Sequence, residues 1–230
     1  IPIPLIFAKI KINKRLNLNT QGIHKYRNLS LSWRNYNKLL NSQRIDKKLI
    51  SYKRWINKIE YPFYKKLIPE NSQKLFYKSI FIIFNEKMDF KEIDPEKWII
   101  TLNSGDELSK NALFIFKKAC MFYKDTGLFY SDEDIINLDN ERIKPHFKTA
   151  WNRELFWNDP QYSSIWIIKG EYWNKAIKKL KRMREKRNLR SILLEVTFQI
   201  EIEKKYIRHL PYILYHKSIK NHESFLNNTK

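Results

Sequence analysis

The stretch that decides the fold class is EYWNKAIKKLKRMREKRNLRSILLEVTFQIEIEKKYIRHL, residues 171–210, which contains neither proline nor glycine. Its apolar residues recur at intervals of three and four, the spacing of one face of an α-helix, with a slip in phase near 184–188. They are Trp173, Ala176, Ile177, Leu180 and Met183, followed by Leu189, Val196, Ile200, Ile207 and Leu210. We therefore predict a long C-terminal helix over 171–210 and a protein of the mainly α class.

Part of the same stretch is open to a second interpretation. Residues 196–202 alternate between apolar and polar side chains, which is the period of a half-buried β-strand. The runs 98–102 and 165–168 are also short and apolar. The alternative is therefore an α+β protein with a small three-stranded sheet, although we favour the helix for 196–202.

The rest of the chain is predicted to be an arm followed by further helices. Residues 1–28 hold two early prolines and no helical stripe, and we expect an extended basic arm. Residues 29–230 form the mainly helical body, and an Asp-Pro helix-start signature at Asp159 favours a division near 159. Helix-start signals and apolar stripes predict the other helices at Ser42 to Pro62, Asn71 to Phe84, Ser104 to Gly127, from Ser131 onward, and over 147–157.

Charge is the strongest compositional signal. The 230 residues include 45 Lys and Arg against 24 Asp and Glu, which gives a net charge of +21. Such an excess repels itself in a compact protein, and a polyanion relieves the repulsion and adds binding energy through counterion release. Apolar residues make up 43% of the chain and aromatic residues 15%, so the composition is that of a folded protein with a core.

Two segments and the arm contain the candidate RNA-binding residues. Segment 175–190 is dense in Lys and Arg, which suit phosphates, and Tyr172 and Trp173 just before it are candidates for stacking on unpaired bases. Segment 47–66 interleaves basic with aromatic residues. We expect the following residues to contact RNA: Lys175, Lys178, Lys179, Lys181, Arg182, Arg184, Lys186, Arg187, Arg190, Lys47, Lys48, Lys53, Arg54, Lys11, Lys14 and Arg15.

Residues suited to catalysis or metal binding are few. The three acids at 132–134 are consecutive, and first-turn acids at a helix dipole explain them more simply than a metal site. The spacing of His209, His216 and His222 matches no zinc signature, and Cys120 is expected to be a small buried hydrophobe. Nucleotide-binding, hydrolase and metalloprotease motifs are missing from the sequence. We therefore expect no enzyme, no cofactor, no metal and no small-molecule substrate.

These features favour an RNA-binding structural protein, specifically a mitochondrial ribosomal subunit in the matrix that contacts rRNA and neighbouring proteins. The composition is similar to that of organelle ribosomal proteins from AT-rich genomes, and the lack of an initiator Met before Ile1 favours a removed targeting peptide over a start inside a longer chain. The first alternative is an accessory subunit of an organelle respiratory or other membrane complex, although no apolar run in the sequence is long enough for a transmembrane segment. The second alternative is a metal-dependent nucleic-acid-processing enzyme that uses Asp132, Asp134 or Asp139.

Overall fold

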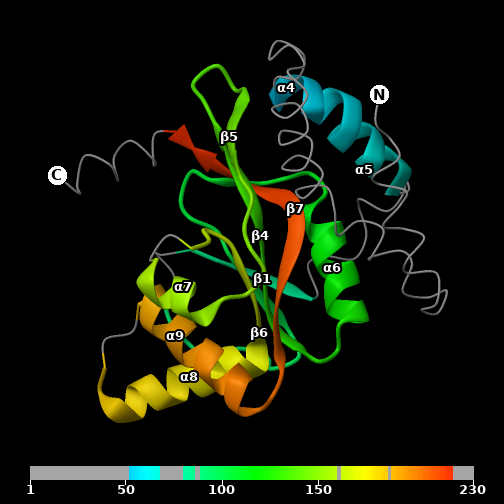
Figure 1. Cartoon of the computed structure of the whole chain (residues 1–230). Helices are drawn as coiled ribbons and strands as arrows, with labels where there is room; N and C mark the ends of the chain where they lie inside the picture. The colour runs from blue at the N-terminus through cyan, green and yellow to red at the C-terminus, as the bar shows by residue number, and fades with distance from the viewer. Residues whose placement is uncertain (1–51, 68–79, 86–88, 160–161, 186–187, 220–230) are drawn as a thin grey trace.

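The computed structural model describes residues 52–67, 80–85, 89–159, 162–185 and 188–219. A seven-stranded mixed sheet runs through them in the order β1-β2-β6-β4-β7-β3, with β5 paired to β4, and it curls into a half-barrel (Figure 1). The strands are β1 (Phe81–Phe84), β2 (Trp98–Thr101), β3 (Glu107–Leu108), β4 (Thr126–Ile136), β5 (Arg142–His146), β6 (Trp166–Lys169) and β7 (Tyr206–Ser218). The helices are α4 (Tyr52–Trp55), the π-helical turn η1 (Ile56–Glu60), α5 (Tyr61–Leu67), α6 (Ala112–Phe122), α7 (Arg153–Asn158), α8 (Gly170–Met183) and α9 (Leu189–Ile202).

The fold is therefore α/β, and the prediction of a mainly α protein is wrong. The runs 98–102 and 165–168 do coincide with strands β2 and β6, but the sheet is far larger than the three-stranded alternative. The helix predicted from Ser131 is part of β4, which is buried along almost its whole length. Helices cover both faces of this strand, so its sequence lacks the alternation that marks a half-exposed strand.

The predicted single helix over 171–210 is two helices and the start of a strand. Helix α8 ends where Arg184 adopts a left-handed conformation with φ of 57°. Asn188 then starts α9, because its side chain accepts from the Ser191 N–H and the Ser191 hydroxyl accepts from the Asn188 N–H. A second left-handed residue, Lys204, turns the chain into β7. The slip in phase at 184–188 is thus a helix boundary, and 196–202 is helical as favoured.

Two hydrophobic clusters lie on opposite faces of the sheet. Phe129 of β4 packs with α6 in one cluster, and its neighbour Leu128 packs with α8 and α9 in the other. Figure 1 shows α6 on one side of the sheet and the α8–α9 pair on the other. Strands from both sides of residue 159 belong to this one sheet, because β6 is hydrogen-bonded between β2 and β4.

The segment from α4 to α5 continues past Pro62, where the sequence predicted a helix end. Pro62 is the second residue of α5, and only Tyr61 separates it from the π-helical turn η1. A proline is tolerated in the first turn of a helix, where its missing N–H costs little. The predicted helix from Asn71 to Phe84 ends in strand β1, and the arm 1–28 lies outside the described residues.

Candidate functional site

The acids Asp132, Glu133 and Asp134 lie in the central strand β4, and all three side chains are buried. Successive residues of a strand point to opposite faces, so neighbouring acids meet different partners. Burying a carboxylate is costly unless cations and hydrogen bonds surround it. Each of the three acids indeed has a cationic or imidazole partner contributed by β5, by β7 or by the residues that follow β5.

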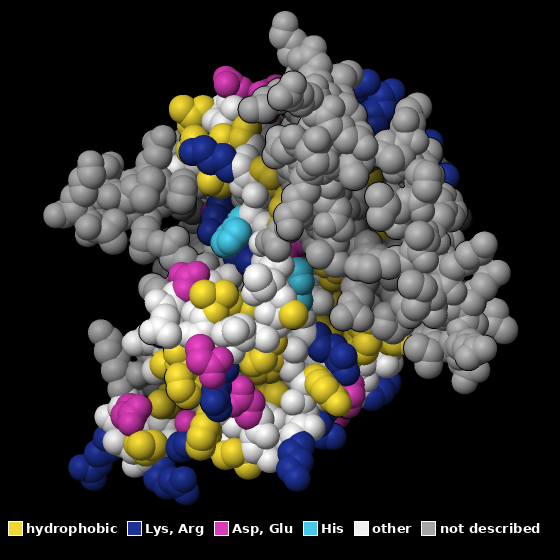
Figure 2. All heavy atoms as spheres, viewed as in Figure 1, with side chains coloured by type: hydrophobic (Ala, Val, Ile, Leu, Met, Phe, Trp, Pro, Cys, Tyr) yellow, Lys and Arg dark blue, Asp and Glu magenta, His cyan; other side chains and the backbone are white. Residues whose placement is uncertain are grey.

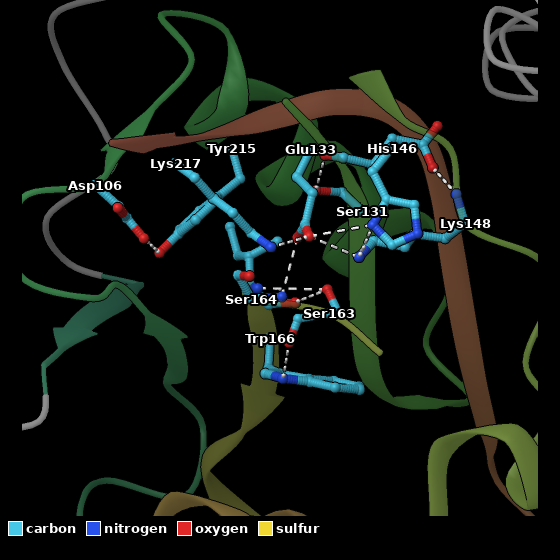
Figure 3. A network of polar contacts seen from close by, with 12 residues as sticks. Asp106, Ser131, Glu133, His146, Lys148, Ser163, Ser164, Trp166, Tyr215 and Lys217 are labelled. Atoms are coloured by element: carbon cyan, nitrogen blue, oxygen red, sulfur yellow. Dashed lines mark hydrogen bonds and ion pairs between the residues drawn. The ribbon is translucent and has the colours of Figure 1, made fainter. Parts of the chain in front are cut away.

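Glu133 is the centre of one charged cluster (Figure 3). Its carboxylate lies 2.8 Å from Lys148 Nζ, 2.7 Å from Lys217 Nζ and 3.4 Å from His146 Nδ1, and it accepts the Ser164 N–H at 3.0 Å. Burial alone raises the pKa of this carboxyl, but the three nitrogenous side chains outweigh burial and hold the pKa well below its ordinary value. Glu133 is therefore charged, and it joins β4, β5 and β7.

Asp134 anchors the α4 helix to the sheet. One of its oxygens accepts from the Tyr52 hydroxyl and from Arg142 Nε, each at 2.6 Å. Arg142 also forms a 2.5 Å ion pair with the buried Glu60 of η1. Burial raises the pKa of Glu60 and Arg142 opposes that shift, whereas the acids around Arg142 raise the pKa of its guanidinium. These contacts fix one face of the α4–α5 segment and leave the other face outward.

Two carboxylate–imidazole pairs cross from β4 to β7. His209 Nε2 lies 2.7 Å from Asp132 Oδ1, and His216 Nδ1 lies 2.5 Å from Asp134 Oδ1. Neither pair could be anticipated, because the partners are 77 and 82 residues apart and no local pattern links them. Within the ranges that the structure describes, no three His, Cys, Asp or Glu residues are grouped so as to hold a metal ion.

The basic residues predicted on 175–190 divide into two groups. Lys175 contacts Glu171 and Glu203, and Lys178 and Lys179 form ion pairs with Glu92 and Glu195. Arg190 donates to the carbonyls of Phe156 and Trp157. These four are engaged within the protein. Three other basic residues are exposed at the end of α8 without an acidic partner in the described part of the chain: Lys181, Arg182 and Arg184.

These three residues define what we call the α8 tip. Figure 2 shows Lys and Arg side chains at the lower left, where Figure 1 places the end of α8. Tyr172 and Trp173 are buried, so they are core residues and not stacking platforms. Lys186 and Arg187 lie outside the described residues.

In the α4–α5 segment, the basic and aromatic residues that are interleaved in the sequence over 47–66 separate into a buried side and an exposed side. Trp55 and Tyr64 face inward and are buried, whereas Tyr61 is 67% exposed. Lys58 of η1 and Lys65 of α5 are exposed residues three positions before and four positions after Tyr61, and Tyr61 and Lys65 have the spacing of one α-helical face. We call the residues Arg54, Lys58, Tyr61 and Lys65 the α4–α5 basic face.

Other residues predicted in this region have different surroundings. Lys53 forms an exposed 2.5 Å ion pair with Glu141 of the β4–β5 turn. Lys11, Lys14, Arg15, Lys47 and Lys48 lie outside the described residues. Cys120 is buried in α6, and burial raises the pKa of its thiol, so its surroundings are those of a core residue rather than a nucleophile.

A comparison with models of known protein families and with curated proteins finds no match to this chain. Its function is therefore inferred from the positions and charges of its own residues.

Proposed function

We propose that this chain is an RNA-binding structural protein that contacts phosphates with the α4–α5 basic face and the α8 tip. The observation that carries the proposal is the α4–α5 basic face. There an exposed tyrosine lies between Lys58 and Lys65, and neither lysine has an acidic partner within the described residues. Single-stranded RNA is bound by this combination, since bases stack on aromatic rings while cations contact the backbone.

The inner side of the same segment supports this proposal. Tyr52, Trp55 and Glu60 are held by contacts to the sheet, so the outward residues are presented from a fixed element. Lys58 and Lys65 belong to one continuous helical segment, Lys58 in η1 and Lys65 in α5. A preorganised pair of cations loses little entropy when it contacts phosphates.

The α8 tip is a second basic surface at the opposite end of the molecule (Figure 1). Its two arginines offer forked donors that match phosphate oxygens. Two separate basic surfaces suit a protein that bridges two RNA segments in a large ribonucleoprotein. The finer proposal is therefore a subunit of the mitochondrial ribosome in the matrix.

The first experiment measures the affinity for a structured RNA between about 50 and 200 mM salt. We expect the double variant Lys58→Glu/Lys65→Glu to bind at least about tenfold more weakly and to lower the salt slope by about two, because two phosphate contacts are lost. The control Lys91→Glu/Lys110→Glu changes the net charge equally at exposed positions outside both surfaces. The proposal would be overturned if the RNA affinity did not change with salt concentration, or if the two double variants weakened RNA binding equally.

The second experiment identifies the particle. Ribosomal particles from the source cell are sedimented before and after RNase, alongside detergent-solubilised membrane complexes. Co-sedimentation that RNase abolishes supports the ribosomal proposal, and co-purification with a membrane complex favours the accessory-subunit alternative. None of the helices in the described ranges has the length and apolar character needed to cross a membrane.

A further inference from the structure

The outward side of α9 carries a stripe of exposed apolar residues. Leu194, Phe198 and Ile202 follow one another at the four-residue spacing of one helix face, and they are 37%, 48% and 59% exposed. The inner side of the same helix packs into the core through the buried Val196 and Ile200. Helix α9 is thus apolar on two opposite sides, whereas a helix at the surface of a protein is normally polar on its outer side.

Contacts on the two flanks of α9 fix the direction of this stripe. On one flank, Glu195 forms a 2.8 Å ion pair with Lys179 of α8, and on the other, Glu201 forms a 3.3 Å ion pair with Arg153 of α7. The two acids lie three residues before and three residues after Phe198, about 60° to either side of it around the helix. Phe198 therefore lies on the middle line of the surface that α7, α9 and α8 form side by side (Figure 1).

Helix α7 adds an exposed tryptophan to this surface. The Arg153 guanidinium, which pairs with Glu201 of α9, lies 4.9 Å from the ring centroid of Trp157, and this ring is 52% exposed. Figure 2 shows hydrophobic side chains among charged ones in the part of the molecule where Figure 1 places α7 and α9. A group of exposed apolar side chains with a polar rim marks contact with another molecule. We call Trp157, Leu194, Phe198 and Ile202 the α7–α9 apolar face.

The charges around this face indicate the chemistry of its partner. The acids on its flanks are neutralised by Lys179 and Arg153. At one end, Lys204 and Lys205 follow α9 and are exposed without an acidic partner in the described part of the chain. At the other end is the α8 tip, where Glu185 offsets only one of three cations. The partner must therefore be apolar in the middle and anionic around it, and a second copy of this chain would instead bring basic ends together.

We propose that the α7–α9 apolar face docks on the surface of a membrane that contains anionic lipids. Lipid phosphates match the basic ends, and the hydrocarbon beneath them accepts the apolar side chains in between. Tryptophan and phenylalanine are suited to this boundary between headgroups and acyl chains. RNA phosphates match the cations but offer nothing to the aliphatic Leu194 and Ile202.

This inference goes beyond the proposed RNA binding and does not conflict with it. The α4–α5 segment lies at the other end of the molecule from α7 and α9 (Figure 1). A chain that docks on a membrane through the α7–α9 apolar face therefore presents the α4–α5 basic face away from the lipid, where RNA can reach it.

The test measures co-sedimentation with vesicles of phosphatidylcholine alone and of phosphatidylcholine and phosphatidylglycerol in equal parts. We expect at least about tenfold tighter binding to the anionic vesicles. The variant Phe198→Ser/Ile202→Ser should bind these vesicles at least about tenfold more weakly, because it removes apolar area that enters the lipid. The matched control Met121→Ser/Leu138→Ser also removes two exposed apolar side chains, from α6 and from the β4–β5 turn, and should bind as the wild type does.

Two further measurements separate the apolar and the electrostatic parts. Lys204→Glu/Lys205→Glu should lose most of the preference for anionic vesicles. Cys120 is buried, so an environment-sensitive fluorophore can be attached to a new surface thiol. We expect the emission of the fluorophore on Leu194→Cys to shift to the blue when anionic vesicles are added, and that on Leu138→Cys to stay unchanged.

The inference is overturned if the chain binds neither type of vesicle, or if the apolar variant and its control bind equally. It is also overturned if the fluorophore on Leu194→Cys reports no change, since binding would then use charge alone. Circular dichroism verifies that the variants are folded, and the fluorophore measurement does not depend on the serine variants. These assays contain no RNA, so a negative result leaves the RNA-binding proposal standing, and a loss of RNA binding leaves this inference standing.

Discussion

Glu133 and Lys148 form a 2.8 Å ion pair in which both side chains are almost fully buried, with exposures of 1% and 2%. Lys217 reaches the same carboxylate at 2.7 Å, so Glu133 neutralises two lysines (Figure 3). We predict that Glu133→Gln lowers the free energy of unfolding by about 3–5 kcal/mol, because it leaves buried charge without a counterion. Urea denaturation at neutral pH measures the loss, and a change under about 1 kcal/mol would contradict this assignment.

The same carboxylate also predicts how the stability of the protein changes at low pH. The pKa of Glu133 in the folded protein is lowered from an ordinary value of about 4.5, so its ionised form contributes stability that is present above that pH. This contribution is lost progressively as the pH falls below about 4.5. The stability difference between the wild type and Glu133→Gln should therefore narrow between about pH 5 and pH 3. A difference that stays constant over this range would show that the ion pair is not its source.

Close packing of β4 on α9 predicts a second large effect. A Cβ atom added at Gly127 would lie 2.7 Å from Ile200 Cγ1 and 2.7 Å from a ring carbon of Tyr172. We expect Gly127→Ala to cost about 1–3 kcal/mol of stability, the usual range for overpacking a core. The cost should shrink in part when Ile200→Ala is already present, since that change removes the clashing atoms of Ile200 and leaves the contact with Tyr172. Strict additivity in this double-mutant cycle would argue against a direct clash.

The helix boundary inside 171–210 predicts a smaller, local effect. Asn188 accepts from the Ser191 N–H at 2.8 Å and begins α9. Asn188→Ala should cost about 1 kcal/mol, as the loss of an N-cap usually does. The control Asn57→Ala changes an exposed asparagine of η1 and should shift stability by less than about 0.5 kcal/mol. If the two substitutions changed the stability equally, Asn188 would not act as an N-cap.

The division of basic residues on α8 predicts two different phenotypes. Reversing Lys181, Arg182 and Arg184 to Glu should weaken RNA binding at least about tenfold at low salt while changing stability by only about 0.5 kcal/mol. Reversing Lys178 and Lys179 places like charges beside Glu92 and Glu195, so it should also destabilise the fold. Sedimentation with RNA and circular dichroism separate the two effects. Unchanged RNA binding by the first variant would exclude the α8 tip from the interface.

Several elements could be predicted from the sequence because their causes are local. Helix α6 lies within the helix predicted from Ser104 to Gly127, and α9 lies within the helix predicted over 171–210. The apolar runs 98–102 and 165–168, considered as candidate strands, coincide with β2 and β6. The net charge of +21 and the core role expected of Cys120 also follow from residue types. Each of these features depends on neighbours within a few residues, so a sequence pattern is sufficient to reveal it.

The sheet and the site depended on contacts between distant residues. Strand β4 carries three consecutive acids, a pattern that resembles the start of a helix. These acids can be buried in a strand only because basic and histidine side chains from β5, from β7 and from the residues that follow β5 neutralise them. Whether an aromatic residue such as Trp173 or Tyr61 faces the core or solvent was likewise decided by packing. The sequence by itself determined charge and local periodicity, whereas the tertiary structure decided the fold class and which charges are neutralised. The physical reason is that burial and ion pairing are energies of long-range contacts, which no local pattern encodes.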